Sequence, residues 1–211
     1  MMTRSLAALE ALNFFMADIR DGLGPFLGVY LQGKGWSPAE IGTVMTIGGL
    51  ATVFATAPAG ALVDKVRAKR AIMVVSAVVT VIVSFAILAF PGFPLTALTQ
   101  VASGVTGAII PAAIAGITLG IVRQKGFPHQ LGRNEAYNHA GNLAAAVLAG
   151  VFGYLFGIEA VFYVMAAMAL GSVVSTALID PKDIDHDAAR GLSEDKPSAG
   201  SISRCCSRRP R

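Results

Sequence analysis

The sequence predicts an all-α membrane protein with six transmembrane helices, and three observations support this class. Apolar residues make up 54% of the chain and only 14% are Asp, Glu, Lys or Arg, whereas soluble domains are about 25% charged. The mean hydropathy is +0.62. Runs of about twenty apolar residues, long enough to cross a bilayer as helices, recur at 6–32, 38–63, 70–90, 94–122, 134–156 and 158–179.

The connections between these spans predict their orientation. Short turns with the sequences QGKGWSP, PGFP and FGIE follow the first, third and fifth spans, whereas DKVRAKR and RQKGFPHQLGR follow the second and fourth. All but two of the 17 lysines and arginines then fall on one side, the exceptions being Lys34 and the intramembrane Arg20. Because basic connections stay inside the cell, both termini and the 123–133 loop are predicted to be cytoplasmic.

The first span, 6–32, carries charge near its middle, at Asp18, Arg20 and Asp21. A charge at the bilayer centre costs about 2.5–3.5 kcal/mol, so these side chains should face the bundle interior or a wet cavity. Asp18 and Asp21 are three residues apart and share a helix face. The GLGP sequence at 22–25 predicts a kink or break. A substrate or coupling site and a structural ion-pair network both remain open.

The second span, 38–63, is apolar but rich in glycine, which suits close helix packing. The third and sixth spans, 70–90 and 158–179, have only Ser and Thr as polar groups apart from Glu159 at one end. They are therefore predicted to face lipid. The first, second, fourth and fifth spans are predicted to surround a common interior.

The fourth span, 94–122, places Gln100, Ser103, Gly107 and Pro111 on one helix face, at i, i+3, i+7 and i+11. Small residues there let a neighbouring backbone approach, and a glutamine can hydrogen-bond across helices. Gln100 therefore has two interpretations, as a packing contact or as a residue that lines a cavity.

The fifth span, 134–156, opens with a polar stripe at helical spacing, formed by Glu135, Asn138, His139 and Asn142. In lipid such a stripe must turn toward protein or water. Glu135 lies at the cytoplasmic end, where water can solvate it. Asn138, His139 and Asn142 lie deeper and are candidate cavity residues, and a single histidine without a second ligand predicts no metal site.

The loop after the second span resembles the signature loop of the major facilitator superfamily, Gly-x-Leu-Ala-Asp-Arg-x-Gly-Arg-Lys. The chain reads GALVDKVRAK over residues 60–69. Four positions match, one arginine is replaced by lysine, and three positions depart, at Val63, Arg67 and Ala68. The resemblance extends over residues 6 to about 180.

This resemblance implies the amino-terminal half bundle of a secondary transporter, six helices arranged as two three-helix repeats. In the family, the loop's aspartate and basic residues latch the two halves together at the cytoplasmic face. The implied gate residues are Gly60, Asp64, Lys65, Arg67 and Lys69. A carboxylate near a helix terminus can meet a helix dipole and nearby cations, which suits Asp64 to that role.

Two other family motifs are absent. Gln100 occupies the place of the fourth-helix arginine tied to proton coupling, and AGNLAAAVLAG lacks the Gly-Pro core of the fifth-helix antiporter motif. A drug–proton antiporter is therefore less favoured than another subgroup. If protons drive transport, Asp18 or Asp21 is the expected carrier.

The predicted function is transmembrane transport of a small solute, as a whole or a part of a secondary transporter in the bacterial cytoplasmic (inner) membrane. Family members usually have twelve helices, which leaves three interpretations: a half that pairs with a second half or a second copy, a truncated product, or a non-transporting scaffold. The expected partners are a small solute, a proton or other coupling ion, and the lipid bilayer.

Several classes are not expected. The sequence has no P-loop, metal-ligand cluster or nucleophile motif, so no enzyme and no cofactor are predicted. The basic residues lack interleaved aromatics, which argues against nucleic acid. Residues 1–180 are predicted to form the transmembrane half, and residues 181–211 a polar, disordered cytoplasmic tail that contains Cys205 and Cys206.

Overall fold

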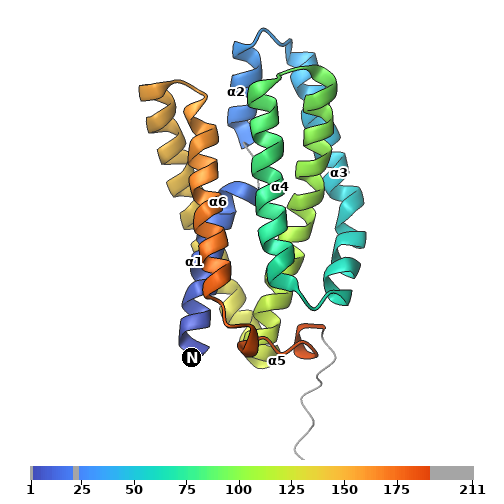
Figure 1. Cartoon of the computed structure of the whole chain (residues 1–211), viewed down its shortest axis with the longest axis vertical. Coiled ribbons are helices and arrows are strands. Elements are labelled where there is room, and N and C mark those ends of the chain that lie inside the picture. Colours follow the sequence, from blue (N-terminus) through green and yellow to red (C-terminus); the bar gives the residue numbers. More distant parts are fainter. Residues whose placement is uncertain (1, 21–23, 191–211) are drawn as a thin grey trace, which may run out of the picture.

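A computed structural model describes residues 2–20 and 24–190, and within these ranges all the regular structure is helical. The elements are α1 (Met2–Arg20), α2 (Gly24–Gly33), α3 (Pro38–Lys65), α4 (Lys69–Ala89), α5 (Phe93–Phe156), α6 (Ala160–Leu178) and two 3₁₀ turns, η1 (Pro181–Asp183) and η2 (Ala188–Arg190). Figure 1 shows them as a bundle of roughly parallel rods. The predicted all-helical class is confirmed.

The predicted spans correspond to these helices with two differences. The first span is described as α1 and α2 on either side of residues 21–23, which lie outside the described ranges together with most of the kink or break predicted at the GLGP sequence. By length and composition alone, four of the described helices could cross a membrane, namely α3, α4, α5 and α6.

The second difference is a correction, because the predicted 123–133 loop is helical. α5 runs through 64 residues and reverses direction at one residue, Arg123, whose φ of 56° and ψ of −176° are non-helical. We call residues 93–122 the first arm of α5 and residues 124–156 its second arm; Figure 1 shows them running in opposite directions. Polar residues expected in a solvated loop instead lie on the second arm, where they bind α1.

The ends of the bundle differ in charge. The start of α1, the α3–α4 connection, the bend at Arg123 and residues 181–190 gather at the lower end in Figure 1, which we call the basic end. The α2–α3, α4–α5 and α5–α6 connections lie at the opposite end. The basic connections thus share one end, as their charge predicted.

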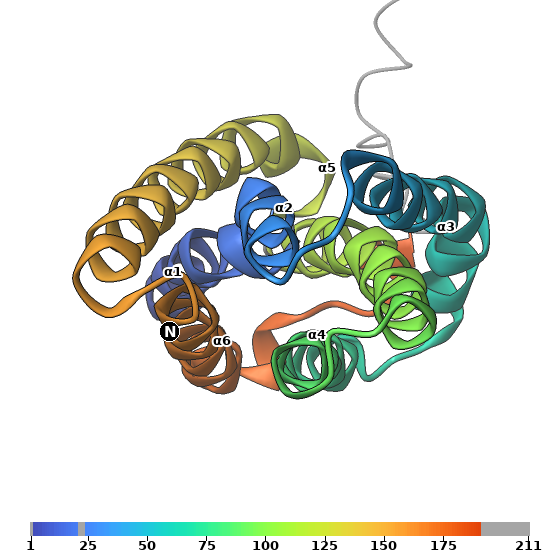
Figure 2. The same ribbon diagram turned by 90° about the horizontal axis from the view of Figure 1, so that it is seen from above.

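The apolar core holds the helices together at both levels of the bundle. Toward the basic end, α1, α4 and the first arm of α5 pack through buried side chains that include Leu9, Met73 and Ile117. Toward the other end, Leu31 of α2 and Phe162 of α6 belong to a second cluster. Seen from above in Figure 2, α4 and α6 lie side by side, and α6 is next to the end of the second arm of α5.

α3 is the least covered of the candidate spans. Only 17% of its most apolar window is buried, against 33% for α4, 50% for α5 and 44% for α6. The expectation that the second span faces a protein interior is therefore not met within the described chain, since α4 and α6, predicted to face lipid, are more buried than α3.

The boundary predicted at residue 181 also differs from the structure. Residues 181–190, which we call the strap, contain both 3₁₀ turns and bury Ile184, Ala188 and Ala189. This segment contacts α5, so part of the predicted tail packs on the bundle. Residues 191–211 lie outside the described ranges, and their predicted disorder stays a prediction.

Candidate functional site

The signature loop is a short connection stabilised by a buried lysine. α3 ends at Lys65 and α4 begins at Lys69. The Lys69 side chain is 2% exposed, and its Nζ donates hydrogen bonds to the carbonyl oxygens of Val63 and Val66, the latter at 3.5 Å. A cation that binds the last carbonyls of a helix also stabilises the negative end of its dipole. Lys69 therefore caps α3 from the start of α4.

The same lysine seats the loop on α5. A Cβ atom added to Gly116 would lie 3.2 Å from both Cδ and Cε of Lys69, so a side chain at this position would crowd the lysine stem. Lys69 thus connects the end of α3, the start of α4 and the first arm of α5. Lys69 is also one of the predicted gate residues; its described contacts hold the loop on α3 and α5, and its gate role stays a prediction.

Arg70, the next residue, caps a second helix. Its Nε donates to the carbonyl oxygen of Thr176 and its Nη2 to that of Ala177, each at 3.0 Å, at the end of α6. Sequence reasoning counted Arg70 only as a topogenic charge. Consecutive basic residues at the start of α4 therefore hold the ends of α3 and α6.

The remaining gate residues face outward at the basic end. Asp64, Lys65 and Arg67 are exposed. A Cβ atom added to Gly60 would meet no atom of the described residues within 4 Å. The loop thus has an anchored part, Lys69, and an open part that contacts little of the half itself. A gate role for the open part stays a prediction.

Gln100 lies where α3 crosses the first arm of α5. A Cβ atom on Gly104 would come 2.5 Å from the carbonyl oxygen of Gly48, so the two backbones touch at this crossing. The Oε1 atom of Gln100 would lie 2.9 Å from a Cβ atom on Gly48. Because Gln100 is half-buried, the structure supports its packing interpretation and leaves part of the side chain accessible.

A groove of about 750 Å³ lies beside this crossing. Small and weakly polar residues from α3 and the first arm line it: Thr52, Thr56, Gly60, Gly107, Ala108, Pro111 and Ala112. Gly107 and Pro111 belong to the helix face predicted to turn inward. The groove therefore brings that face together with Gly60 of the signature loop.

The polar stripe of the second arm is only partly brought together. Asn138 is buried, and Asn142 Nδ2 donates to Asn138 Oδ1 at 3.5 Å. Next to them a Cβ atom on Gly141 would overlap the carbonyl oxygen of Phe14 in α1. His139 is exposed on another face of the arm, whereas Asn138 and Gly141 are buried. A cavity role for His139 stays a prediction.

The charged residues of the first span are partly described. Asp18 is half-buried in α1, one turn after Phe14. This places Asp18 on the stretch of α1 that approaches Gly141. Asp21 and the side chain of Arg20 lie outside the described part of the chain. Their predicted role in a cavity or in coupling stays a prediction.

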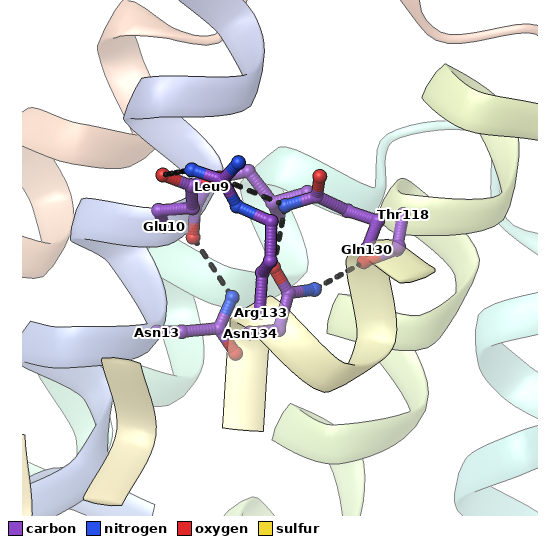
Figure 3. Close-up of polar contacts among 7 residues, drawn as sticks. All are labelled: Leu9, Glu10, Asn13, Thr118, Gln130, Arg133 and Asn134. Carbon is purple, nitrogen blue, oxygen red and sulfur yellow. Dashed lines mark hydrogen bonds and ion pairs between the residues drawn. The ribbon is translucent and has the colours of Figure 1, made fainter. Parts of the chain in front are cut away.

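A buried polar network that the sequence analysis missed joins α1 to both arms of α5 (Figure 3). Glu10, whose side chain is 9% exposed, pairs with Arg133 through a 2.8 Å contact between Oε1 and Nε. Gln130 Nε2 donates to Glu10 Oε1 at 3.2 Å and to Asn134 Oδ1 at 3.1 Å. Asn134 Nδ2 in turn donates to Thr118 Oγ1 of the first arm at 2.9 Å.

This network had a sequence signal. Glu10 lies in the first span, and Gln130, Arg133 and Asn134 lie at i, i+3 and i+4. Gln130 and Arg133 were assigned to a loop and Asn134 to the start of the fifth span, so the helical spacing of the three residues was missed. The network joins α1 to both arms of α5 at the basic end, because the polar side chains of its members hydrogen-bond to one another.

One ion pair is found at the opposite end of the bundle. Lys34 Nζ lies 3.1 Å from Glu159 Oε1, which connects the turn after α2 to the start of α6. The hydrogen bond that Lys34 donates to the Glu159 carboxylate raises the pKa of Lys34 above its usual range. Both side chains are about half exposed, so water screens the pair and it adds little to stability.

No metal centre is found within residues 2–20 and 24–190, since no three His, Cys, Asp or Glu side chains there could share an ion. Glycine contacts between helices, buried polar groups and helices long enough to span a bilayer are instead typical of a polytopic membrane protein.

The comparisons with known proteins agree with this class. Residues 6–209 match the Major Facilitator Superfamily, and the chain belongs to that family. It is thus a multi-pass membrane protein from a family of small-solute transporters rather than of enzymes, as its sequence indicated.

Two relatives in Mycobacterium tuberculosis, strains CDC 1551 and H37Rv, are described as uncharacterized MFS-type transporters. Each is 46% identical over 190 residues, which cover 90% of this chain and 46% of the relative. The chain therefore spans slightly less than half the length of the curated relatives it matches.

Proposed function

We propose that the chain acts as one six-helix half of a secondary transporter and moves a small solute across a bacterial cytoplasmic membrane together with a second half. In this arrangement α1 with α2, α3, α4, the two arms of α5 and α6 cross the bilayer as two three-helix repeats. The basic end lies in the cytoplasm, as the distribution of lysine and arginine favours.

The observation that carries the proposal is an open seam along α3. Small residues and one valine recur at alternating steps of four and three, at Gly42, Thr46, Gly49, Val53, Thr56 and Gly60. All are exposed or, at Gly60, half-buried. This spacing lets another helix pack closely at a crossing angle of about 20°.

The length of the relatives supports a helix of a second half as the occupant of this seam. The matched region covers 46% of each relative, and the remainder is long enough for another such bundle. Family transporters bind their solutes between two halves near the midplane. On this proposal the groove beside Gly60 and Gly107 becomes part of the interface or cavity once the second half is present.

The proposed cavity residues are Asp18, Arg20, Asp21, Gln100, Asn138, His139 and Asn142. Asp18 lies on α1, which the second arm of α5 approaches at Gly141, and Gln100 lies on the first arm. The proposed gate is the open part of the signature loop, where Asp64, Lys65 and Arg67 are exposed beside the end of the α3 seam. Contacts from a second half to these charges would form and break as the halves rock.

A crosslinking experiment tests the seam. Cys205 and Cys206 are changed to Ser, single cysteines are placed at Gly49 on the seam and at Ile82 on the exposed face of α4, and the chain is expressed with a candidate second half. We expect crosslinks from Gly49→Cys to the second half and none from Ile82→Cys. Equal crosslinking at both positions would contradict the proposal.

Solute uptake by cells that express the chain alone and with the second half then tests transport. Replacing Asp18 by Asn should abolish uptake without loss of protein from the membrane. A non-transporting scaffold predicts instead that partner binding survives replacement of Asp18, Arg20 and Asp21 by apolar residues, and that uptake never exceeds that of cells without the chain.

A further inference from the structure

The strap docks on a glycine of the first arm of α5. The Asp185 backbone N–H donates to the carbonyl oxygen of Gly120 at 2.9 Å. A Cβ atom on Gly120 would lie 2.8 Å from Ile184 Cγ2 and 3.2 Å from Ala189 Cβ. Ile184 and Ala189 are both buried. The strap thus occupies space that any side chain at residue 120 would fill.

The strap also holds the bend between the two arms. Arg123 has a positive φ of 56°, a region that residues other than glycine rarely adopt and that persists only where surrounding contacts impose it. Its Nη2 atom lies 3.1 Å from Asp185 Oδ2. Because the arms are joined by this single residue, its conformation sets how they diverge.

Asp185 connects these contacts to the strap itself. Its Oδ1 accepts hydrogen bonds from the backbone N–H groups of Ala188 and Asp187, at 3.1 Å and 3.0 Å. These hydrogen bonds, the one from Ala188 foremost, hold the pKa of Asp185 below its usual range, and Arg123 adds to the effect. One side chain therefore orders the last turn of the strap and contacts the bend.

The strap reaches two further elements at the basic end. Ser5 Oγ of α1 donates to Asp183 Oδ2 at 2.6 Å and accepts the backbone N–H of Asp180 at 3.2 Å. Gly120 lies one helical turn after Gly116, which seats Lys69 of the signature loop. The strap and the anchored part of the signature loop therefore occupy adjacent positions on the first arm.

We propose that the strap is a clasp that fixes the angle between the two arms of α5, so that residues 1–190 rather than 1–180 form the structural unit of the half. Docked on Gly120, the strap holds the face of the first arm that lines the groove at a fixed position relative to Asn138 and Asn142 of the second arm. The clasp concerns the half alone, whereas its consequence for transport rests on the proposed function.

Cysteine labelling of the full chain tests docking without reference to transport. In a background with Cys205 and Cys206 changed to Ser, Ala188→Cys should react with a maleimide at least tenfold more slowly than Asp187→Cys, because Ala188 is 1% exposed and Asp187 is exposed. Adding Gly120→Leu should abolish that protection, since its side chain needs the space of Ile184.

Gly132→Leu is the matched control, because a Cβ atom there meets nothing within 4 Å among the described residues. It should leave Ala188→Cys protected. Asp185→Ala is a milder second variant for the case in which Gly120→Leu does not fold, and it should raise the labelling rate by removing the hydrogen bonds to the strap. Fast labelling of Ala188→Cys in the parent, or protection in every variant, would overturn docking.

A distance measurement then tests the clasp. Spin labels at the exposed Leu98 of the first arm and Val151 of the second report on the angle between the arms. Release of the strap by Asp185→Ala or Gly120→Leu should broaden the distance distribution, and Gly132→Leu should leave it narrow. An unchanged distribution together with a released strap would show that the strap docks without setting the angle, which overturns the proposal.

Discussion

Replacing Lys69 by methionine tests whether this residue of the signature loop stabilises the half itself. Methionine keeps most of the volume that packs over Gly116 and removes the ammonium group. The carbonyl oxygens of Val63 and Val66 then lose their donor at the end of α3. Because Lys69 is 2% exposed, water does not readily replace the lysine.

The expected loss follows from the geometry. Of the two hydrogen bonds, the one to Val66 is at the 3.5 Å limit, so only the bond to Val63 is counted at full strength. A hydrogen bond from a charged donor contributes about 1.5–3 kcal/mol net. We therefore expect the free energy of unfolding to fall by about 2 kcal/mol. For a chain of this size, that corresponds to a decrease of about 4–8 °C in Tm.

The assay is thermal unfolding of the purified chain in detergent, with Lys65→Met as the control. Lys65 lies in the same loop but is exposed, and its replacement should change Tm by less than about 1 °C, since exposed charges contribute little. Lys69→Arg should restore part of the loss, limited by the room over Gly116. If Lys69→Met and Lys65→Met unfold at the same temperature, the capping role assigned to Lys69 is wrong.

Three further predictions concern contacts elsewhere in the half. Glu10→Gln should lower the free energy of unfolding by about 1–2 kcal/mol, because it removes the charge that pairs with Arg133. The loss is limited because the arginine is half exposed and water screens it. The control Glu135→Gln, at an exposed residue, should have no effect on Tm. Gly141→Val should reduce the monodisperse fraction in size-exclusion chromatography, since its Cβ overlaps the α1 backbone, whereas Gly150→Val, where the described residues leave open space, should not. The pKa of Asp185 is lowered by hydrogen bonds in the strap, so its contribution is present above about pH 4 and is lost as pH falls through the folded-state pKa. The distance distribution between spin labels on the two arms should therefore broaden as the pH falls below about 4, and Asp185→Asn should remove this pH dependence.

The helices could be predicted because their signal is local. Long apolar runs bounded by charge, glycine and proline mark α3, α4 and α6 within a few residues of their bounds. The start of α3 is an example. The side chains of Ser37 and Glu40 each accept a hydrogen bond from the other's backbone N–H, which forms a capping box, and Pro38 occupies the first helical position. All of these residues lie within four positions. The signature loop was located for the same reason, as contiguous residues.

Long-range contacts explain what could not be predicted. In the sequence Lys69 is one of several cations in the loop. Only the fold brings its side chain against Gly116 and its ammonium group to the carbonyl oxygen of Val63 at the end of α3. His139 and Asn138 are adjacent in the same polar stripe, yet the crossing at Gly141 buries Asn138 and leaves His139 exposed. A polar stripe in the sequence locates the buried face of a helix only approximately. The position of the neighbouring helix determines which residues of the stripe are buried.

The reversal of α5 shows the limit of local patterns most clearly. Gly126 and Pro128 indicate a loop in the sequence, yet the chain turns earlier, at Arg123, and both residues lie on the helix that follows. An arginine with positive φ is disfavoured by its own backbone, so the cause lies in distant residues. Asp185, 62 positions later, binds its guanidinium, and Glu10, more than a hundred positions earlier, holds Gln130 and Arg133 on the second arm. The turn is therefore a property of the assembled basic end, in which α1, α5 and the strap define one another's positions.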